Sequence, residues 1–186
     1  MALQRLNFLQ KALQRSVPLI LGILFILSCV GPSEPPGDTP WLAVDERQEI
    51  DLSGTFKTVD GKEVSLADLH QDKVLFLNVW ATWCGPCRAE MPSMASLYEE
   101  LYDDGLAMVA VSEEDTQTVR QYLQEQPYPF TILLDTENIL SQRFEIYALP
   151  TTFIVDNQGR LALRHAGAYR WDSPVIIEQF RRLVAQ

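Results

Sequence analysis

Two cysteines separated by two residues stand just after the most uniformly apolar segment in the body of the chain. That segment, Lys73–Trp80, reads KVLFLNVW, and its branched and aromatic residues predict a strand buried on both faces. From Pro86 to Leu101, apolar residues recur at the spacing of one helix face. Cys84 and Cys87 therefore lie where a strand ends and a helix begins, which is the edge where open α/β sheets present their binding sites.

The start of a helix changes the chemistry of a cysteine. Its free N–H groups and its dipole favour a thiolate and lower the pKa of the thiol. The two-residue spacer lets the sulfurs close into a disulfide, with Cys84 expected to face solvent and Cys87 to be covered. Pro86 fits the first helical turn, where its missing N–H costs nothing. Half of a zinc site and an inert structural bridge remain alternatives, although three cysteines and two histidines offer few zinc ligands.

The rest of the body predicts strands that alternate with helices. Asp60-Gly61 and Asp156–Gly159 are turn sequences that predict two β-hairpins. The expected strands are 56–59, 63–66, 73–80, 106–111, 130–134, 151–155 and 161–165, and the expected helices are 86–101, 116–126, 139–144 and a final one opened by Ser173-Pro174. This order implies an α/β fold with a central mixed β-sheet and helices on both faces.

The N-terminus carries the pattern of an export signal. Three basic residues precede a short apolar run, 17–30, which is shorter than the roughly 20 residues that span a bilayer core. We therefore predict a signal peptide at 1–28. Ile26-Leu27-Ser28-Cys29 is similar to a bacterial lipobox, which implies lipid attachment at Cys29. An uncleaved signal anchor and ordinary cleavage remain alternatives, and all three place the remaining chain outside the cytoplasm.

A segment rich in proline and glycine follows. Residues 31–40 hold four prolines and two glycines, a composition that cannot build a packed core or a ladder of hydrogen bonds. We predict a Pro/Gly-rich tether at 29–47 and a single domain at 48–186. The 15 basic and 25 acidic residues give a net charge of −10, which argues against a nucleic-acid partner.

Two separated segments resemble a known family. Residues 78–92 and 148–155 are similar to the TlpA/ResA-like branch of the thioredoxin superfamily, which comprises membrane-tethered extracytoplasmic thiol-disulfide oxidoreductases. The resemblance covers roughly 48–186. It implies a thioredoxin-like fold with an N-terminal β-hairpin extension and an αβ insertion typical of that branch. It also implies a cis peptide bond before Pro150, against the active-site disulfide; a proline that merely opens a strand is the alternative.

The same resemblance implies the roles of the site residues. Cys84 is the expected nucleophile and Cys87 the resolving cysteine of a redox-active disulfide. Asn78 stands where cytoplasmic thioredoxin has a buried acid, and an amide cannot accept a proton at physiological pH. Glu90, one helical turn after Cys87, can face back toward the sulfurs, so we assign proton handling to it. A surface carboxylate at a helix N-terminus is the alternative.

Other residues complete the predicted site and its surroundings. The substrate-binding residues are expected to be Trp83, Gly85, Pro86, Leu149, Pro150 and Thr151. Residues 113–115, Glu-Glu-Asp, predict a solvated, helix-capping acidic turn. No metal site is expected, because His70 and His165 are distant in sequence from each other and from the cysteines, and Met91 and Met94 have core spacing.

The resemblance implies a monomeric reductase without a cofactor. Its partners are expected to be exported client proteins with disulfides, such as apocytochrome c or related clients, and a membrane electron-donor thiol-disulfide protein. A disulfide oxidase or isomerase of the same fold is the main alternative. A peroxidase would need a Thr-x-x-Cys-like loop, and Thr82-Trp83-Cys84 does not have that spacing. A non-catalytic binding module is the remaining alternative.

Overall fold

The computed structural model describes residues 41–186. The predicted signal peptide at 1–28, the predicted lipid attachment at Cys29 and the first part of the tether lie outside the described residues. Within residues 41–186, no helix combines the length and the apolar character that a membrane span requires.

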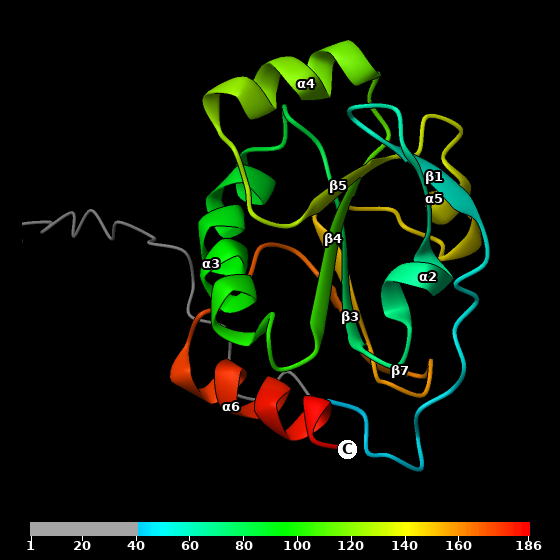
Figure 1. Ribbon diagram of the computed structural model, residues 1–186, viewed down its shortest axis with the longest axis vertical. Helices are drawn as coiled ribbons and strands as arrows, with labels where there is room; N and C mark the ends of the chain where they lie inside the picture. Colours follow the sequence, from blue (N-terminus) through cyan, green and yellow to red (C-terminus); the bar gives the residue numbers. More distant parts are fainter. Residues whose placement is uncertain (1–40) are drawn as a thin grey trace, which may run out of the picture. The chain divides into compact units, whose positions relative to one another are not determined.

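The described residues form one mixed seven-stranded sheet with the order β2-β1-β5-β4-β3-β6-β7 (Figure 1). Its strands are β1 (Thr55–Thr58), β2 (Glu63–Ser65), β3 (Val74–Trp80), β4 (Leu106–Ser112), β5 (Thr131–Leu134), β6 (Thr151–Val155) and β7 (Leu161–Ala166). The central strands β3, β4 and β5 are parallel, and the β1–β2 and β6–β7 hairpins extend the sheet with antiparallel strands. Both predicted hairpins are therefore present.

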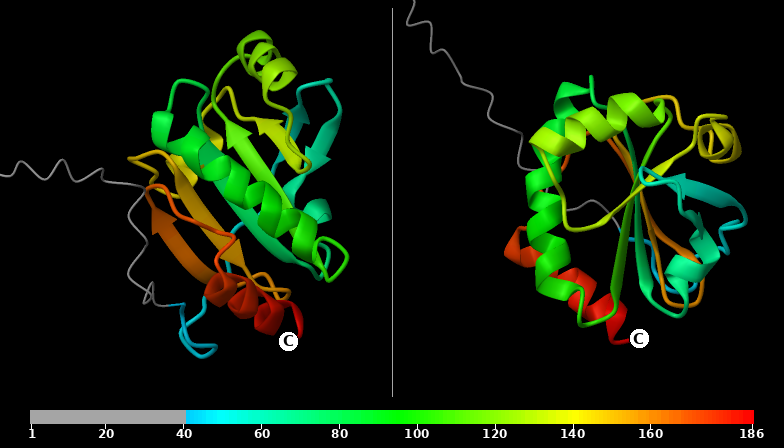
Figure 2. Two further views of the ribbon diagram at one scale, coloured as in Figure 1. Left: turned by 90° about the vertical axis from the view of Figure 1, so that its left-hand side faces the viewer. Right: turned by 45° about the horizontal axis from the view of Figure 1, so that its top comes forward.

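Helices cover both faces of the sheet, as predicted (Figures 1 and 2). The helices are α2 (Leu66–His70), α3 (Gly85–Leu101), α4 (Thr116–Glu125), α5 (Ile139–Arg143) and α6 (Pro174–Val184). Alternate residues of β3 explain the two layers. Phe76 packs in one core with residues of α3, α4 and α6, whereas Leu75 and Leu77 pack in a second core with residues of α2 and α5. This arrangement buries β3 on both faces.

Side-chain caps fix where the helices begin. Asp115 accepts hydrogen bonds from the N–H groups of Gln117 and Thr118 at the start of α4, and Ser173 accepts one from Ile176 before the N1 proline of α6. α2 is the one named helix that the sequence did not predict. It has five residues, too few to show a helical period, and begins at the cap Ser65.

Residues 41–47, assigned to the tether from their sequence, contact the domain. The Trp41 ring packs edge-on against Phe180 of α6 at 5.2 Å between centroids. The Leu42 N–H donates to the Ala162 carbonyl oxygen. Arg47 forms a buried ion pair with Asp156 at 3.1 Å. The end of the predicted tether is therefore held against α6 and the β6–β7 hairpin.

Candidate active site

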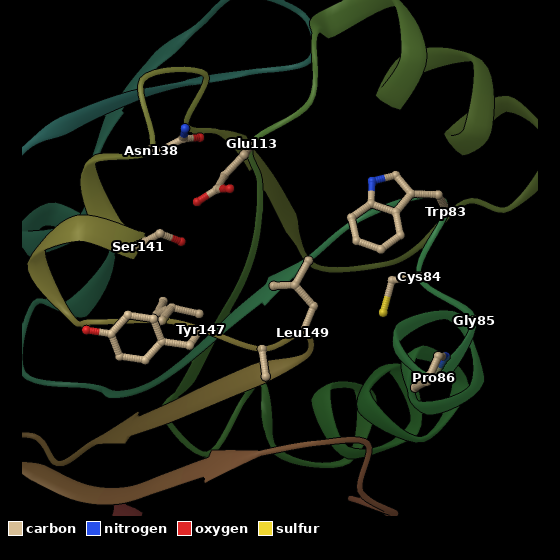
Figure 3. A pocket seen from close by; sticks show the side chains of 11 residues that line it. Trp83, Cys84, Gly85, Pro86, Glu113, Asn138, Ser141, Tyr147 and Leu149 are labelled. Carbon is tan, nitrogen blue, oxygen red and sulfur yellow. The ribbon is translucent and has the colours of Figure 1, made fainter.

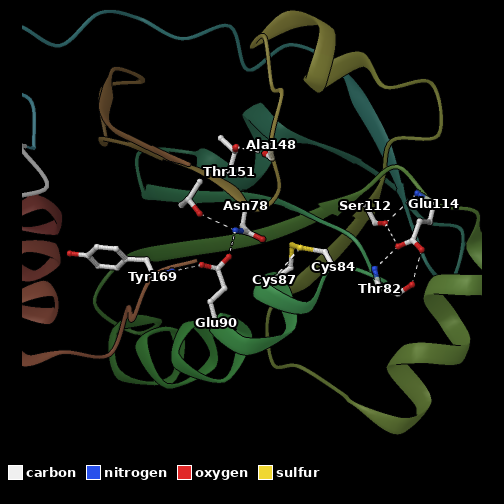
Figure 4. Close-up of a disulfide and its surroundings, with 11 residues drawn as sticks. Asn78, Thr82, Cys84, Cys87, Glu90, Ser112, Glu114, Ala148, Thr151 and Tyr169 are labelled. Atoms are coloured by element: carbon white, nitrogen blue, oxygen red, sulfur yellow. Dashed lines mark hydrogen bonds between the residues drawn. A yellow bond between two sulfur atoms is a disulfide. The ribbon is translucent and has the colours of Figure 1, made fainter. Parts of the chain in front are cut away.

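The two cysteines lie at the junction of β3 and α3 and form a disulfide (Figure 4). Cys84 is the N-cap residue of α3, and its Sγ accepts a hydrogen bond from the Cys87 N–H at 3.2 Å. Pro86 occupies the first turn of α3. The Cys84 sulfur therefore lies in the field of the free N–H groups of a helix, which stabilises negative charge on it once the disulfide is opened.

Cys84 is more covered than the sequence indicated. Only 4% of Cys84 is exposed, and Cys87 is 0% exposed. Cys84 does not stand on the open surface but lines a pocket of about 480 Å³. Of the two sulfur-bearing residues, Cys84 therefore borders this pocket, which we call the Cys84 pocket, and Cys87 does not line it.

The Cys84 pocket has walls from three parts of the chain (Figure 3). Its lining residues are Trp83, Cys84, Gly85, Pro86, Glu113, Asn138, Ser141, Ile146, Tyr147, Ala148 and Leu149. Two aromatic side chains on it, Trp83 and Tyr147, are 72% and 89% exposed. Large exposed aromatic side chains beside a nucleophile are a surface on which a polypeptide can dock.

The predicted substrate-binding residues divide into two groups. Trp83, Gly85, Pro86 and Leu149 line the Cys84 pocket. The peptide bond before Pro150 is cis, and Pro150 is buried and does not line the pocket. Thr151 is also buried, and its hydroxyl donates to the Ala148 carbonyl oxygen at 2.7 Å. Thr151 therefore positions the loop that forms the wall.

Glu90 is buried behind the disulfide and is not a surface carboxylate. Its side chain, 3% exposed, accepts hydrogen bonds from Asn78 Nδ2 at 2.9 Å, the Tyr169 N–H at 3.0 Å and Trp171 Nε1 at 3.2 Å. Burial raises the pKa of the Glu90 carboxyl from 4.5 to about 7, although these three hydrogen bonds act in the opposite direction. Glu90 can therefore gain and lose a proton near neutral pH, one helical turn from Cys87.

Asn78 joins β3 to α3 beside the disulfide (Figure 4). Its Nδ2 donates to Glu90 and also to Thr152 Oγ1 at 2.9 Å. Asn78 Oδ1 is buried, with no hydrogen-bond partner among residues 41–186. Asn78 cannot itself carry the proton. It therefore orients the carboxyl of Glu90, which can.

The acidic turn 113–115 differs from its prediction. Asp115 caps α4 as expected. Glu114 instead accepts hydrogen bonds from the Thr82 N–H at 2.6 Å and the Thr82 hydroxyl at 2.7 Å, which fixes the loop that leads to Cys84. Glu113 lines the Cys84 pocket. Two of the three carboxylates thus belong to the site, because β4 ends beside β3 at the same edge of the sheet.

The remaining candidate residues have structural roles. Met91 and Met94 are buried in the core, as predicted. Trp80 is 1% exposed and packs against Tyr122. His70 Nε2 is 2.7 Å from the Asp156 carbonyl oxygen, and His165 packs edge-on against Tyr169. Among residues 41–186, no three side chains of the His, Cys, Asp or Glu type gather as metal ligands.

The sequence profile of the AhpC/TSA family matches residues 48–164. The chain is 41% identical over 117 residues to the thioredoxin-like protein YneN of Bacillus subtilis, covering 61% of this chain and 67% of YneN. It is 31% identical over 147 residues to the thiol-disulfide oxidoreductase ResA of Bacillus subtilis, covering 75% and 79% of the two chains.

A solved structure shares the arrangement of the sheet and helices. It is the thiol:disulfide interchange protein, a thioredoxin family protein, from Chlorobium tepidum. The TM-score is 0.61 at 28% sequence identity, and the match covers 75% of this chain and 95% of that one. The fold is therefore thioredoxin-like, as the resemblance implied.

Proposed function

The chain belongs to the AhpC/TSA family of thioredoxin-like proteins and is a thiol-disulfide oxidoreductase, and on that premise we propose that it reduces disulfides in exported proteins. One observation carries the proposal: the Cys84–Cys87 disulfide borders a pocket at Cys84, and a buried acid, Glu90, follows Cys87 by one turn of α3. Clients that are unfolded when they are exported, apocytochrome c among them, present their disulfides in accessible segments.

The proposed reaction transfers two electrons from the dithiol to the client. The Cys84 thiolate attacks one sulfur of the client disulfide, so that a Cys84–client bond forms and the other client sulfur leaves as a thiolate. Cys87 then attacks Cys84 Sγ. This step re-forms the Cys84–Cys87 disulfide and releases the second client thiolate, and each client thiolate takes up a proton. A membrane dithiol protein is the proposed donor that reduces the pair again.

Glu90 is proposed to serve the second step. Cys87 must lose its proton before it can attack, and it is 0% exposed, so bulk water does not take that proton directly. The Glu90 carboxyl lies one helical turn from Cys87, and its pKa of about 7 suits a group that accepts a proton and returns it near neutral pH. Its ionised form also disfavours a neighbouring thiolate, which favours the oxidised pair and hence electron donation.

The reduction potential of the Cys84–Cys87 pair tests whether the protein acts as a reductase or as an oxidase. Thioredoxin-fold potentials run from about −270 mV in thioredoxin to about −120 mV in DsbA, and Cys-Gly-Pro-Cys is the motif of reducing thioredoxins. A titration of the full-length chain against glutathione should give a value near the thioredoxin end. A value near about −120 mV would instead support the oxidase alternative. A reductase or an oxidase should catalyse insulin reduction by dithiothreitol, whereas a non-catalytic binding module should not. Peroxide consumption would identify a peroxidase.

We also propose that the domain lies outside the cytoplasm, tethered to a bacterial membrane through its N-terminus. The basic and apolar pattern of residues 1–28 and the lipobox-like segment that ends at Cys29 support this location. In a bacterial host, Cys29→Ser should abolish labelling with a fatty acid and release the protein from the membrane fraction. A variant that stayed in the membrane with unchanged mass would favour an uncleaved anchor.

A further inference from the structure

We infer that Glu113 makes the Cys84 pocket selective for client disulfides that are flanked by a basic side chain, arginine above all. This inference rests on the proposed function and specifies its client. Glu113 follows β4 directly, at the sheet edge that also presents the disulfide. Its carboxylate points toward Ser141, across the pocket from Cys84 (Figure 3).

The charge of the Cys84 pocket comes from this one side chain. The residues that line the pocket are aromatic, aliphatic, small or neutral polar, apart from Glu113, and no lysine or arginine is among them. The neighbouring acid, Glu114, is engaged with Thr82 and Ser112. Glu113 is therefore the carboxylate that a bound client segment meets.

One oxygen of the Glu113 carboxylate has no hydrogen-bond partner in the described part of the chain. Its Oε1 is shielded from solvent and accepts no hydrogen bond from any of residues 41–186. A shielded carboxylate oxygen without a donor costs free energy, because it has lost its water without a replacement. A guanidinium or ammonium group that enters with the client supplies the missing donor and the opposite charge.

The aromatic side chains favour the same occupant. Trp83 and Tyr147 are 72% and 89% exposed on the pocket. Exposed aromatic faces attract cations, and a guanidinium stacks on them better than an ammonium does. The net charge of the chain, −10, also draws a basic segment toward it in the encounter. A short extended segment with arginine close to its disulfide satisfies all three features.

Three synthetic peptides test the inference with the full-length, reduced protein. Each peptide carries the same internal disulfide, flanked by arginine, glutamine or glutamate. The measured quantity is the single-turnover rate constant of disulfide reduction, followed by tryptophan fluorescence. We expect the arginine peptide to react about tenfold faster than the glutamine peptide, and the glutamate peptide to react slowest. The differences should shrink as salt is added, because salt screens partly exposed charges.

Two variants assign the preference to Glu113. Glu113→Gln should bring the rate ratio of the arginine and glutamine peptides close to one, and Glu113→Lys should reverse the preference toward the glutamate peptide. Glu125→Gln, which removes the same charge from an exposed position at the end of α4, should keep the wild-type ratio. A preference for arginine that persists in both Glu113 variants would assign it to the net charge and overturn the inference.

A small neutral disulfide separates this inference from the proposed function. Hydroxyethyl disulfide has no flanking charge and needs only the exchange chemistry of Cys84 and Cys87. If the wild type reduces hydroxyethyl disulfide but shows no preference among the peptides, the role of Glu113 is wrong and the proposed function stands. If it reduces neither hydroxyethyl disulfide nor any peptide, the proposed function itself fails.

Discussion

Asn78 Nδ2 donates a hydrogen bond to Glu90 Oε1 over 2.9 Å and thereby ties β3 to α3 beside the disulfide. In this hydrogen bond Glu90 is the acceptor, which suits an ionised carboxylate. A protonated Glu90 needs an acceptor for its own O–H, and Asn78 Oδ1 is buried there without a hydrogen-bond partner among the described residues. Rotation of the amide exchanges donor for acceptor, so the pair can accommodate both protonation states.

Glu90 makes the stability of the oxidised protein depend on pH. Below about pH 4.5 the carboxyl is protonated in both the folded and the unfolded state. As the pH rises from 4.5 toward 7, the unfolded state loses the proton first, because burial raises the pKa of folded Glu90 to about 7. Stability should therefore fall over this range, by about 3 kcal/mol from this group. Urea unfolding at pH 5 and pH 8 measures the change.

Glu90→Gln isolates that contribution, because a glutamine carries no titrating proton. The variant should lose less stability than the wild type between pH 5 and pH 8, by the same amount of about 3 kcal/mol. Parallel curves for the two proteins would show that Glu90 titrates at its ordinary pKa. The rate of exchange with a neutral disulfide should also lose its pH dependence near 7, since the amide of the variant cannot accept the Cys87 proton.

Asn78→Asp places a second carboxyl group against Glu90. Two carboxyl groups at hydrogen-bond distance share one proton, so the pair should stay half-protonated well above pH 7. The pH–rate profile of single-turnover reduction should move to higher pH, and stability at pH 8 should fall. The same change made together with Glu90→Gln is the control. The double variant has no carboxyl at position 90. If its pH–rate profile shifted as much as that of Asn78→Asp alone, coupling between positions 78 and 90 would be excluded.

Local sequence patterns were sufficient for most of the fold. The apolar run of β3, the helical spacing of α3 and the two turn sequences each lie within a few residues, so the pattern specifies the element. The five-residue helix α2 and the contact of Trp41 with Phe180 were not predicted. Helix α2 is too short to show a helical period in its apolar residues. The contact of Trp41 with Phe180 joins residues at opposite ends of the domain.

The site residues on α3 were predictable from the sequence, whereas those that other strands and loops bring to the site were less so. The spacing of Cys84, Cys87 and Glu90 on one helix is a local property. The donors that hold Glu90 are not, because Tyr169 and Trp171 follow about eighty residues later. The roles of Glu113 and Glu114 depend on β4 pairing with β3. An acidic pair directly after a predicted parallel strand was the available signal.

Glu114 should contribute to stability through the loop before Cys84. It accepts from the Thr82 N–H and hydroxyl and from Ser112 Oγ, and glutamine keeps only one of the two acceptor oxygens. Because the side chain is half-buried, we expect Glu114→Gln to cost about 1.5 kcal/mol, the low end for hydrogen bonds to a charged group. Urea unfolding measures it. Glu125→Gln, exposed on α4, should stay within about 0.5 kcal/mol of the wild type.

The unequal exposure of the two cysteines predicts which one forms the mixed disulfide. Cys84 lines the pocket through which we propose that a client enters, whereas Cys87 is 0% exposed and does not line it. Cys87→Ser should therefore accumulate a client joined to Cys84, because the resolving attack is missing. Cys84→Ser should accumulate none and should not reduce insulin, since the remaining thiol is covered. Non-reducing electrophoresis with mass spectrometry identifies the joined cysteine. A trapped client on Cys87 would mean that the pocket is not the entry path and that the two roles are exchanged.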